Sequence, residues 1–149
     1  MSKISNISKI RKNEYMITVK STINASIHKV WEFWTLPEHI KEWAFASPEW
    51  HAPHAENDLR EGGRFSTTMA AKDGSMSFDF WGEYTLITQN KAINYTMGDG
   101  RKAEIIFTVT SNGVEITESF DPETENSEEM QRGGWQAILD NFKSYVEKK

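Results

Sequence analysis

The sequence predicts one α+β domain: a strand, two short helices, six more antiparallel strands in a curved sheet, and a long C-terminal helix. Two observations predict this order. Alternating β-branched segments are separated by turn residues, and a helical apolar period occurs only near the start and at the end of the chain. Strands and helices do not alternate, which excludes a parallel sheet. The length of 149 residues fits a single domain, 1–149, with an ordered core from about 14 to 147.

The first three elements follow from local patterns. Residues 15–24 are β-branched and roughly alternating, which predicts the first strand. Ser26 can cap a helix over 27–35, where apolar residues recur at the i, i+3, i+4 and i+7 positions of one helix face. Pro37 ends that helix and suits the first turn of a second helix, predicted over 38–44.

The middle of the chain reads as a loop followed by a series of hairpins. Two prolines around Trp50 favour a loop over 45–53. Turn-forming residues then separate six strands at Gly62-Gly63, Asp73-Gly74, 89–91, 98–100 and 111–113. Together with the first strand, they make seven.

The last segment changes to a helical period. Asn126 or Ser127 can cap it, and its apolar stripe consists of Trp135, Ile138, Leu139, Phe142 and Val146. The sheet offers the largest apolar surface, so we expect this helix to lie across it. Gly133-Gly134 costs roughly 1 kcal/mol per glycine inside a helix, which predicts a close approach to the sheet or a bend.

Composition excludes several function classes. With 17 basic and 22 acidic residues the formal net charge is -5, so nucleic acid is not an expected partner. The absence of cysteine excludes disulfides and thiolate chemistry and fits the cytoplasm. The polar N-terminus has no apolar signal segment, and no run is long enough for membrane insertion. No phosphate-loop or dinucleotide pattern occurs, so no cofactor is expected.

Four strings carry a family resemblance, in family order: VWEFWTLPEHIKEW at 30–43, DLREGGRF at 58–65, WGEY at 81–84 and GGWQAILDNF at 133–142. With them the chain resembles the heat-shock-protein-90 ATPase activator-like family of the START and birch-pollen-allergen (SRPBCC) superfamily. The resemblance implies the helix-grip fold. It also implies a mostly apolar cavity, between sheet and long helix, that binds lipids, polyketides or flavonoid-like compounds.

Ten residues are predicted to bind such a ligand: Trp34, Trp50, His54, Asn57, Met69, Phe80, Tyr95, Glu118, Trp135 and Leu139. Aromatic and apolar side chains would supply the buried area, and His54, Asn57, Tyr95 and Glu118 would orient the ligand. In a regular strand His54 and Asn57 point to opposite faces, so one of them is misplaced unless a bulge intervenes.

Glu118 is the one candidate for catalysis. If it faces the helix together with Val114, Ile116 and Phe120, desolvation raises its pKa and suits it to proton transfer. Two other readings remain open: Arg64 or another cation neutralises it, or the opposite strand parity places it in water.

A metal site is not predicted. His51, His54, Glu56 and Asp58 offer imidazole and carboxylate ligands, but their spacing matches no established zinc motif. Pro53 also interrupts regular presentation of the two histidines.

These observations favour binding of a hydrophobic or aromatic small molecule rather than catalysis. One alternative is a polyketide cyclase or dehydratase, which needs acid and base groups in addition to a cavity. The other is a chaperone ATPase co-activator or protein-interaction module, with an unidentified protein partner. That module predicts an exposed apolar patch.

Overall fold

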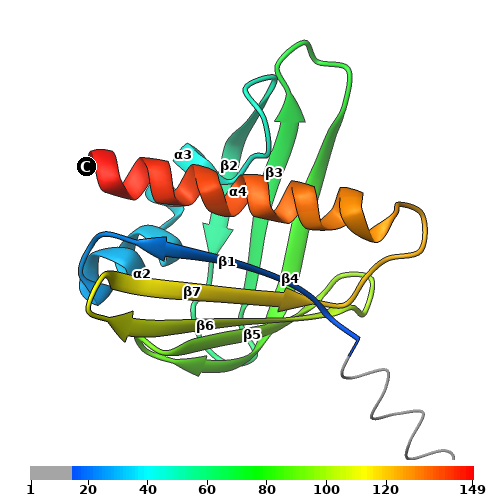
Figure 1. Ribbon diagram of the computed structural model, residues 1–149. Coiled ribbons are helices and arrows are strands. Elements are labelled where there is room, and N and C mark those ends of the chain that lie inside the picture. The colour runs from blue at the N-terminus through cyan, green and yellow to red at the C-terminus, as the bar shows by residue number, and fades with distance from the viewer. Residues whose placement is uncertain (1–14) are drawn as a thin grey trace, which may run out of the picture.

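The computed structural model describes residues 15–149, and the polar N-terminal segment lies outside them (Figure 1). The predicted α+β helix-grip fold and element order are confirmed. The elements are β1 (Ile17–Ile23), α2 (Ile27–Thr35), α3 (Pro37–Trp43), β2 (Trp50–Asn57), β3 (Arg64–Ala71), β4 (Ser77–Thr88), β5 (Ala92–Met97), β6 (Lys102–Thr110), β7 (Gly113–Phe120) and α4 (Glu128–Lys148). Within residues 15–149, no helix is long and apolar enough to cross a membrane.

The seven strands form one antiparallel sheet in the order β1-β7-β6-β5-β4-β3-β2. Because β1 pairs with β7, the first and last strands lie side by side, and β1 and β2 are the two edges. Helices α2 and α3 connect these two edges. The sheet curves, and α4 runs across it (Figure 1).

The helix starts have the caps that the sequence suggests. The Ser26 hydroxyl oxygen accepts a hydrogen bond from the Lys29 amide, and that of Ser127 accepts one from the Met130 amide. The α2 bounds agree with the prediction, whereas α3 starts one residue earlier than predicted, at Pro37. Proline fits the first helical position because the amide that it lacks would have no partner there.

The loop predicted over 45–53 is wrong in its second half, since β2 already begins at Trp50. The register between β2 and β3 shifts between His51 and His54, on either side of Pro53. An edge strand tolerates a proline at such an irregularity, because a missing amide there disturbs only one ladder. Pairing with β3 therefore outweighs the local preference for a loop.

The core lies beneath the C-terminal half of α4. Leu139, Phe142 and Val146 are fully buried, and the ring of Phe142 meets those of Trp34 and Trp43 edge-on at 4.9 Å each. The N-terminal half of α4 contributes only one fully or nearly buried side chain, that of Gln131. The packing is thus concentrated at one end of the helix.

The glycine pair of α4 does not have the predicted close approach to the sheet. A Cβ added at Gly133 or Gly134 would meet nothing within 4 Å. Gly134 instead borders a cavity between α4 and the sheet, whereas Gly133 is exposed.

Candidate functional site

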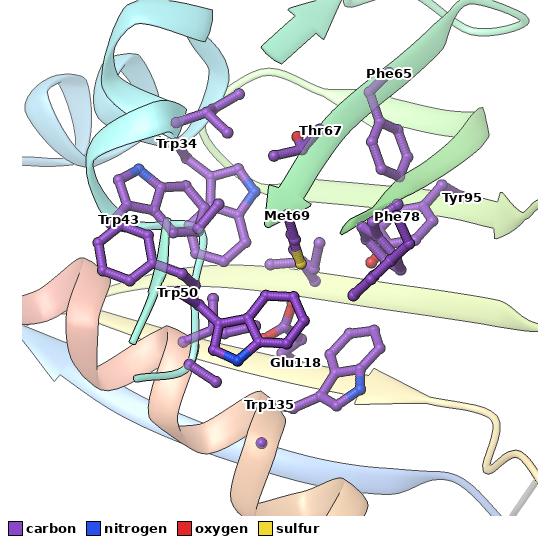
Figure 2. Close-up of a pocket in the computed structure, with 18 of the residues that line it drawn as sticks. Trp34, Trp43, Trp50, Phe65, Thr67, Met69, Phe78, Tyr95, Glu118 and Trp135 are labelled. Atoms are coloured by element: carbon purple, nitrogen blue, oxygen red, sulfur yellow. The ribbon is translucent and has the colours of Figure 1, made fainter. Parts of the chain in front are cut away.

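A cavity of about 460 Å³ lies beside the packed core, under the N-terminal half of α4. This volume is in the range of sites for drug-sized ligands. Its walls come from the sheet, from the three helices and from the segment between α3 and β2 (Figure 2). Ten aromatic side chains line it: Trp34, Trp43, Phe45, Trp50, Phe65, Phe78, Phe80, Tyr84, Tyr95 and Trp135.

Strand alternation places most of this lining. Alternate residues point to one face of a sheet, so Phe65, Thr67 and Met69 of β3 face the cavity together. On neighbouring strands Phe80 of β4 and Tyr95 of β5 do the same. The rings of Phe65 and Tyr95 meet edge-on with centroids 4.8 Å apart, so this wall is fixed by ring contacts.

The other side of the cavity is the segment that leads from α3 into β2. Phe45 and Trp50 also line a second hollow, whose remaining walls include Lys41 and Lys72. These two aromatic side chains therefore separate the cavity from a polar surface. The amide of Asn141 on α4 donates to the backbone oxygen of Phe45 at 3.0 Å and so ties this segment to the helix.

Glu118 points into the cavity from β7 (Figure 2). It is 7% exposed, and its partners across the sheet are the apolar residues Val19 and Ile105. Within residues 15–149 no side chain or backbone group forms a hydrogen bond or ion pair with its carboxyl group. Burial alone raises its pKa to about 8, because the charged form loses its hydration.

Both competing interpretations of Glu118 are wrong. Arg64 lies on the outer side of the sheet, 3.9 Å from a carboxylate oxygen of Glu83 and over the ring of Trp81. Strand parity buries Glu118 on the same face as Ile116 and Phe120 instead of exposing it to water.

Two polar residues accompany Glu118 in the lining. Burial raises the pKa of Tyr95 well above its ordinary value, and the nearby Glu118 carboxyl raises it further. Arg101 also borders the cavity, but its Nε lies 2.7 Å from a carboxylate oxygen of Asp99, and its Nη1 donates to the backbone oxygen of Asp121. This cation is thus already bound elsewhere.

Seven of the ten predicted ligand residues line the cavity: Trp34, Trp50, Met69, Phe80, Tyr95, Glu118 and Trp135. His54 does not, because its side chain is 59% exposed and lies 3.1 Å from a carboxylate oxygen of Glu56. Leu139 is fully buried and is not part of the lining.

Asn57 points inward but has a structural partner on each side. Its amide nitrogen donates to the backbone oxygen of Thr35 at 2.6 Å, and its oxygen accepts from the hydroxyl of Tyr84 at 2.5 Å. It therefore connects the end of α2 to β4 beside the cavity. The β2 irregularity precedes His54, so it cannot turn His54 and Asn57 to the same face.

The prediction omitted several lining residues, among them Phe65, Thr67, Tyr84, Arg101 and Gly134. Strand alternation in the sequence does put Phe65 and Thr67 on the same face as Met69, which is among the ten. No sequence pattern indicates that Gly134 borders a cavity, because a glycine beside open space and a glycine in close contact with a neighbour look the same in a sequence. Among residues 15–149 no cluster of three or more His, Asp or Glu side chains could hold a metal.

Comparison with known families identifies one match. Residues 24–147 match the model of the family described as Activator of Hsp90 ATPase homolog 1-like protein. The chain belongs to this family. The match covers α2, α3, the strands β2 to β7 and all of α4 except its last residue.

Solved structures that match most of this chain have the same fold. An AHSA1-like protein from Aeromonas hydrophila shares 41% identity over 89% of this chain and 92% of its own, with a TM-score of 0.85. A protein from Cytophaga hutchinsonii shares 59% identity over the same proportions, with a TM-score of 0.78. A Chromobacterium violaceum protein at 20% identity, covering 89% of this chain and 97% of its own with a TM-score of 0.80, shows the fold alone. The comparison with curated proteins found no match.

Proposed function

We propose that the protein binds a hydrophobic or aromatic small molecule in the cavity under α4. The observation that carries this proposal is an unfilled, mainly aromatic space of about 460 Å³ beside a core that is otherwise tightly packed. A concave, mainly apolar space of this volume, open to the surface on one side, is typical of sites that bind small molecules. We propose that this binding takes place in the cytoplasm, with which the cysteine-free composition is consistent.

Gly134 supports the proposal because it keeps space open at a cost to the helix. Glycine destabilises a helix interior by roughly 1 kcal/mol relative to alanine. No neighbouring atom within 4 Å requires a glycine here. The missing side chain leaves part of the cavity empty, and a ligand gains that volume.

The aromatic walls favour a flat or ring-containing ligand. Phe80 meets Trp135 edge-on at 6.0 Å, and Trp50 meets Phe78 in the same manner at 6.0 Å. Faces and edges of such rings stack with a planar ligand, adding to a burial contribution of roughly 25 cal/mol per Å² of apolar area.

Paired substitutions in α4 test this proposal. Gly134→Leu places a side chain in the cavity, whereas Gly133→Leu adds the same side chain at an exposed position one residue away. We expect naphthalene-based probes, followed by tryptophan fluorescence, to bind wild type and Gly133→Leu alike and to lose at least about tenfold in affinity for Gly134→Leu. Equal affinities for both variants would contradict the proposal.

One observation favours a second function, the cyclisation or dehydration of a polyketide-like substrate. Glu118 is a buried carboxyl group in the cavity with a pKa of about 8, which suits it to proton transfer near neutral pH. Under this alternative Glu118→Gln abolishes turnover but leaves substrate binding intact. An unchanged rate would remove Glu118 from any mechanism.

A further inference from the structure

The geometry points to a ligand with a positively charged amine on an aromatic or aliphatic body, its ammonium group bound by the carboxylate of Glu118. This inference rests on the proposed function, since it names the chemical class of the ligand that the cavity takes.

The first argument is that Glu118 has no partner. It is the only acidic side chain in the lining, it is only 7% exposed, and it forms no hydrogen bond within the described residues. A buried carboxylate is expensive unless a cation or donors accompany it. A ligand ammonium would provide both the charge and the donors.

The second argument comes from the groups that face Glu118. On β1 and β6 its neighbours are Val19 and Ile105, and α4 contributes only Gly134, Trp135 and Ile138 to the lining. None of these residues titrates.

The remaining titratable groups of the lining offer no counter-charge. They are Tyr84 of β4, Tyr95 of β5 and Arg101, which immediately precedes β6. The two tyrosines are neutral at pH 7, and burial raises their pKa values further above the ordinary value of 10.0. Arg101 is engaged by Asp99 and by the backbone oxygen of Asp121.

The third argument is the aromatic wall itself. The face of an aromatic ring carries negative potential and attracts a cation, most strongly for tryptophan. Trp50 and Trp135 line the same cavity as Glu118 (Figure 2). An anionic ligand would meet both a carboxyl group and these faces, so the lining selects against it.

Binding of an ammonium group has a proton signature. Since burial raises the pKa of Glu118 to about 8, the carboxyl group is mostly protonated at pH 7 in the empty protein. An ammonium ligand stabilises the carboxylate, so the Glu118 proton passes to the buffer as the ligand binds. Apparent affinity for the amine should therefore rise as pH increases, by up to about tenfold per pH unit below pH 8.

The experiment compares two probes of matched shape, 2-(naphthalen-2-yl)ethylamine and 2-propylnaphthalene, which differ in an ammonium against a methyl group. Calorimetry at pH 7 in buffers of different ionisation enthalpy measures affinity and proton release. We expect Glu118→Gln to weaken binding of the amine by at least about tenfold and to leave the affinity for the hydrocarbon unchanged. Glu104→Gln removes one exposed charge from the adjacent strand β6 and serves as the control.

The outcomes separate the two proposals. If neither probe binds to the wild type, the proposed function fails. If both probes bind and Glu118→Gln leaves the amine unaffected, the cavity binds ligands but the assignment of an amine is overturned. Stronger binding of the amine at low pH than at pH 8 would also overturn it, because the ammonium group would then not depend on an ionised carboxyl group of Glu118.

Discussion

The indole of Trp135 lies flat on the ring of Phe120, with centroids 3.8 Å apart and planes at 10°. This stack joins α4 to β7 at the cavity. One face of Trp135 is thereby held against the sheet by a fully buried ring, and the indole remains part of the cavity lining. Trp135 thus serves both packing and the proposed binding.

Trp135→Ala should therefore affect stability and binding together. Removing the indole loses the stack on Phe120, and we expect the free energy of unfolding in urea to fall by about 2–4 kcal/mol. Affinity for naphthalene probes should also fall. Val109→Ala, at a side chain that is 65% exposed, is the control and should change stability by less than about 0.5 kcal/mol. A loss of comparable size in the control would contradict this account.

Substitution of Asn57 should destabilise the protein more than substitution of its hydroxyl partner, Tyr84. Asn57→Ala leaves both the Thr35 carbonyl and the Tyr84 hydroxyl without their partner, which we expect to cost about 1–3 kcal/mol. Tyr84→Phe removes only one of the two bonds and should cost less. A double-mutant cycle measured by urea unfolding should give a coupling energy above about 0.5 kcal/mol, and additive effects would refute the connection.

Glu118 should make stability depend on pH. Its pKa is about 8 in the folded protein and has its ordinary value of 4.5 when unfolded, so the unfolded state loses this proton first. The contribution of protonated Glu118 to the free energy of unfolding is fully present below pH 4.5 and is lost as pH rises to 8. The free energy of unfolding then falls by at most about 1.4 kcal/mol per pH unit.

Urea unfolding of wild type and Glu118→Gln at several pH values isolates this contribution, because all other groups titrate in both proteins. As pH increases from 4.5 to 8, the free energy of unfolding of wild type should fall relative to that of Glu118→Gln. A difference that is independent of pH would show that Glu118 is hydrated in the folded state.

Gly113, at the start of β7, should not tolerate a side chain. Its φ is +127°, and a Cβ would lie 2.1 Å from the backbone oxygen of Ile23, so the end of β1 would have to move. We expect Gly113→Ala to destabilise the protein by at least about 2 kcal/mol in thermal or urea unfolding. Gly74→Ala, also at positive φ but in open space, should cost only about 1 kcal/mol. Equal losses would remove the steric argument.

The sequence by itself determined the elements and their order. The α2 bounds follow from apolar spacing and the Ser26 cap, and the final helix follows from its stripe and the Ser127 cap, since these signals act within a few residues. The side-chain period of a strand also put Glu118 on one face of β7 together with Ile116, but only the structure showed that this face is the buried one.

The tertiary structure alone decided what surrounds these residues. Trp50 lies in a strand because β3 pairs with it, and His54 lies outside because the β2 irregularity precedes it. The isolation of Glu118 and the space beside Gly134 depend on distances between elements far apart in the chain. Strand parity assigns a side chain to a face, but an empty volume or a missing partner exists only after all elements have packed.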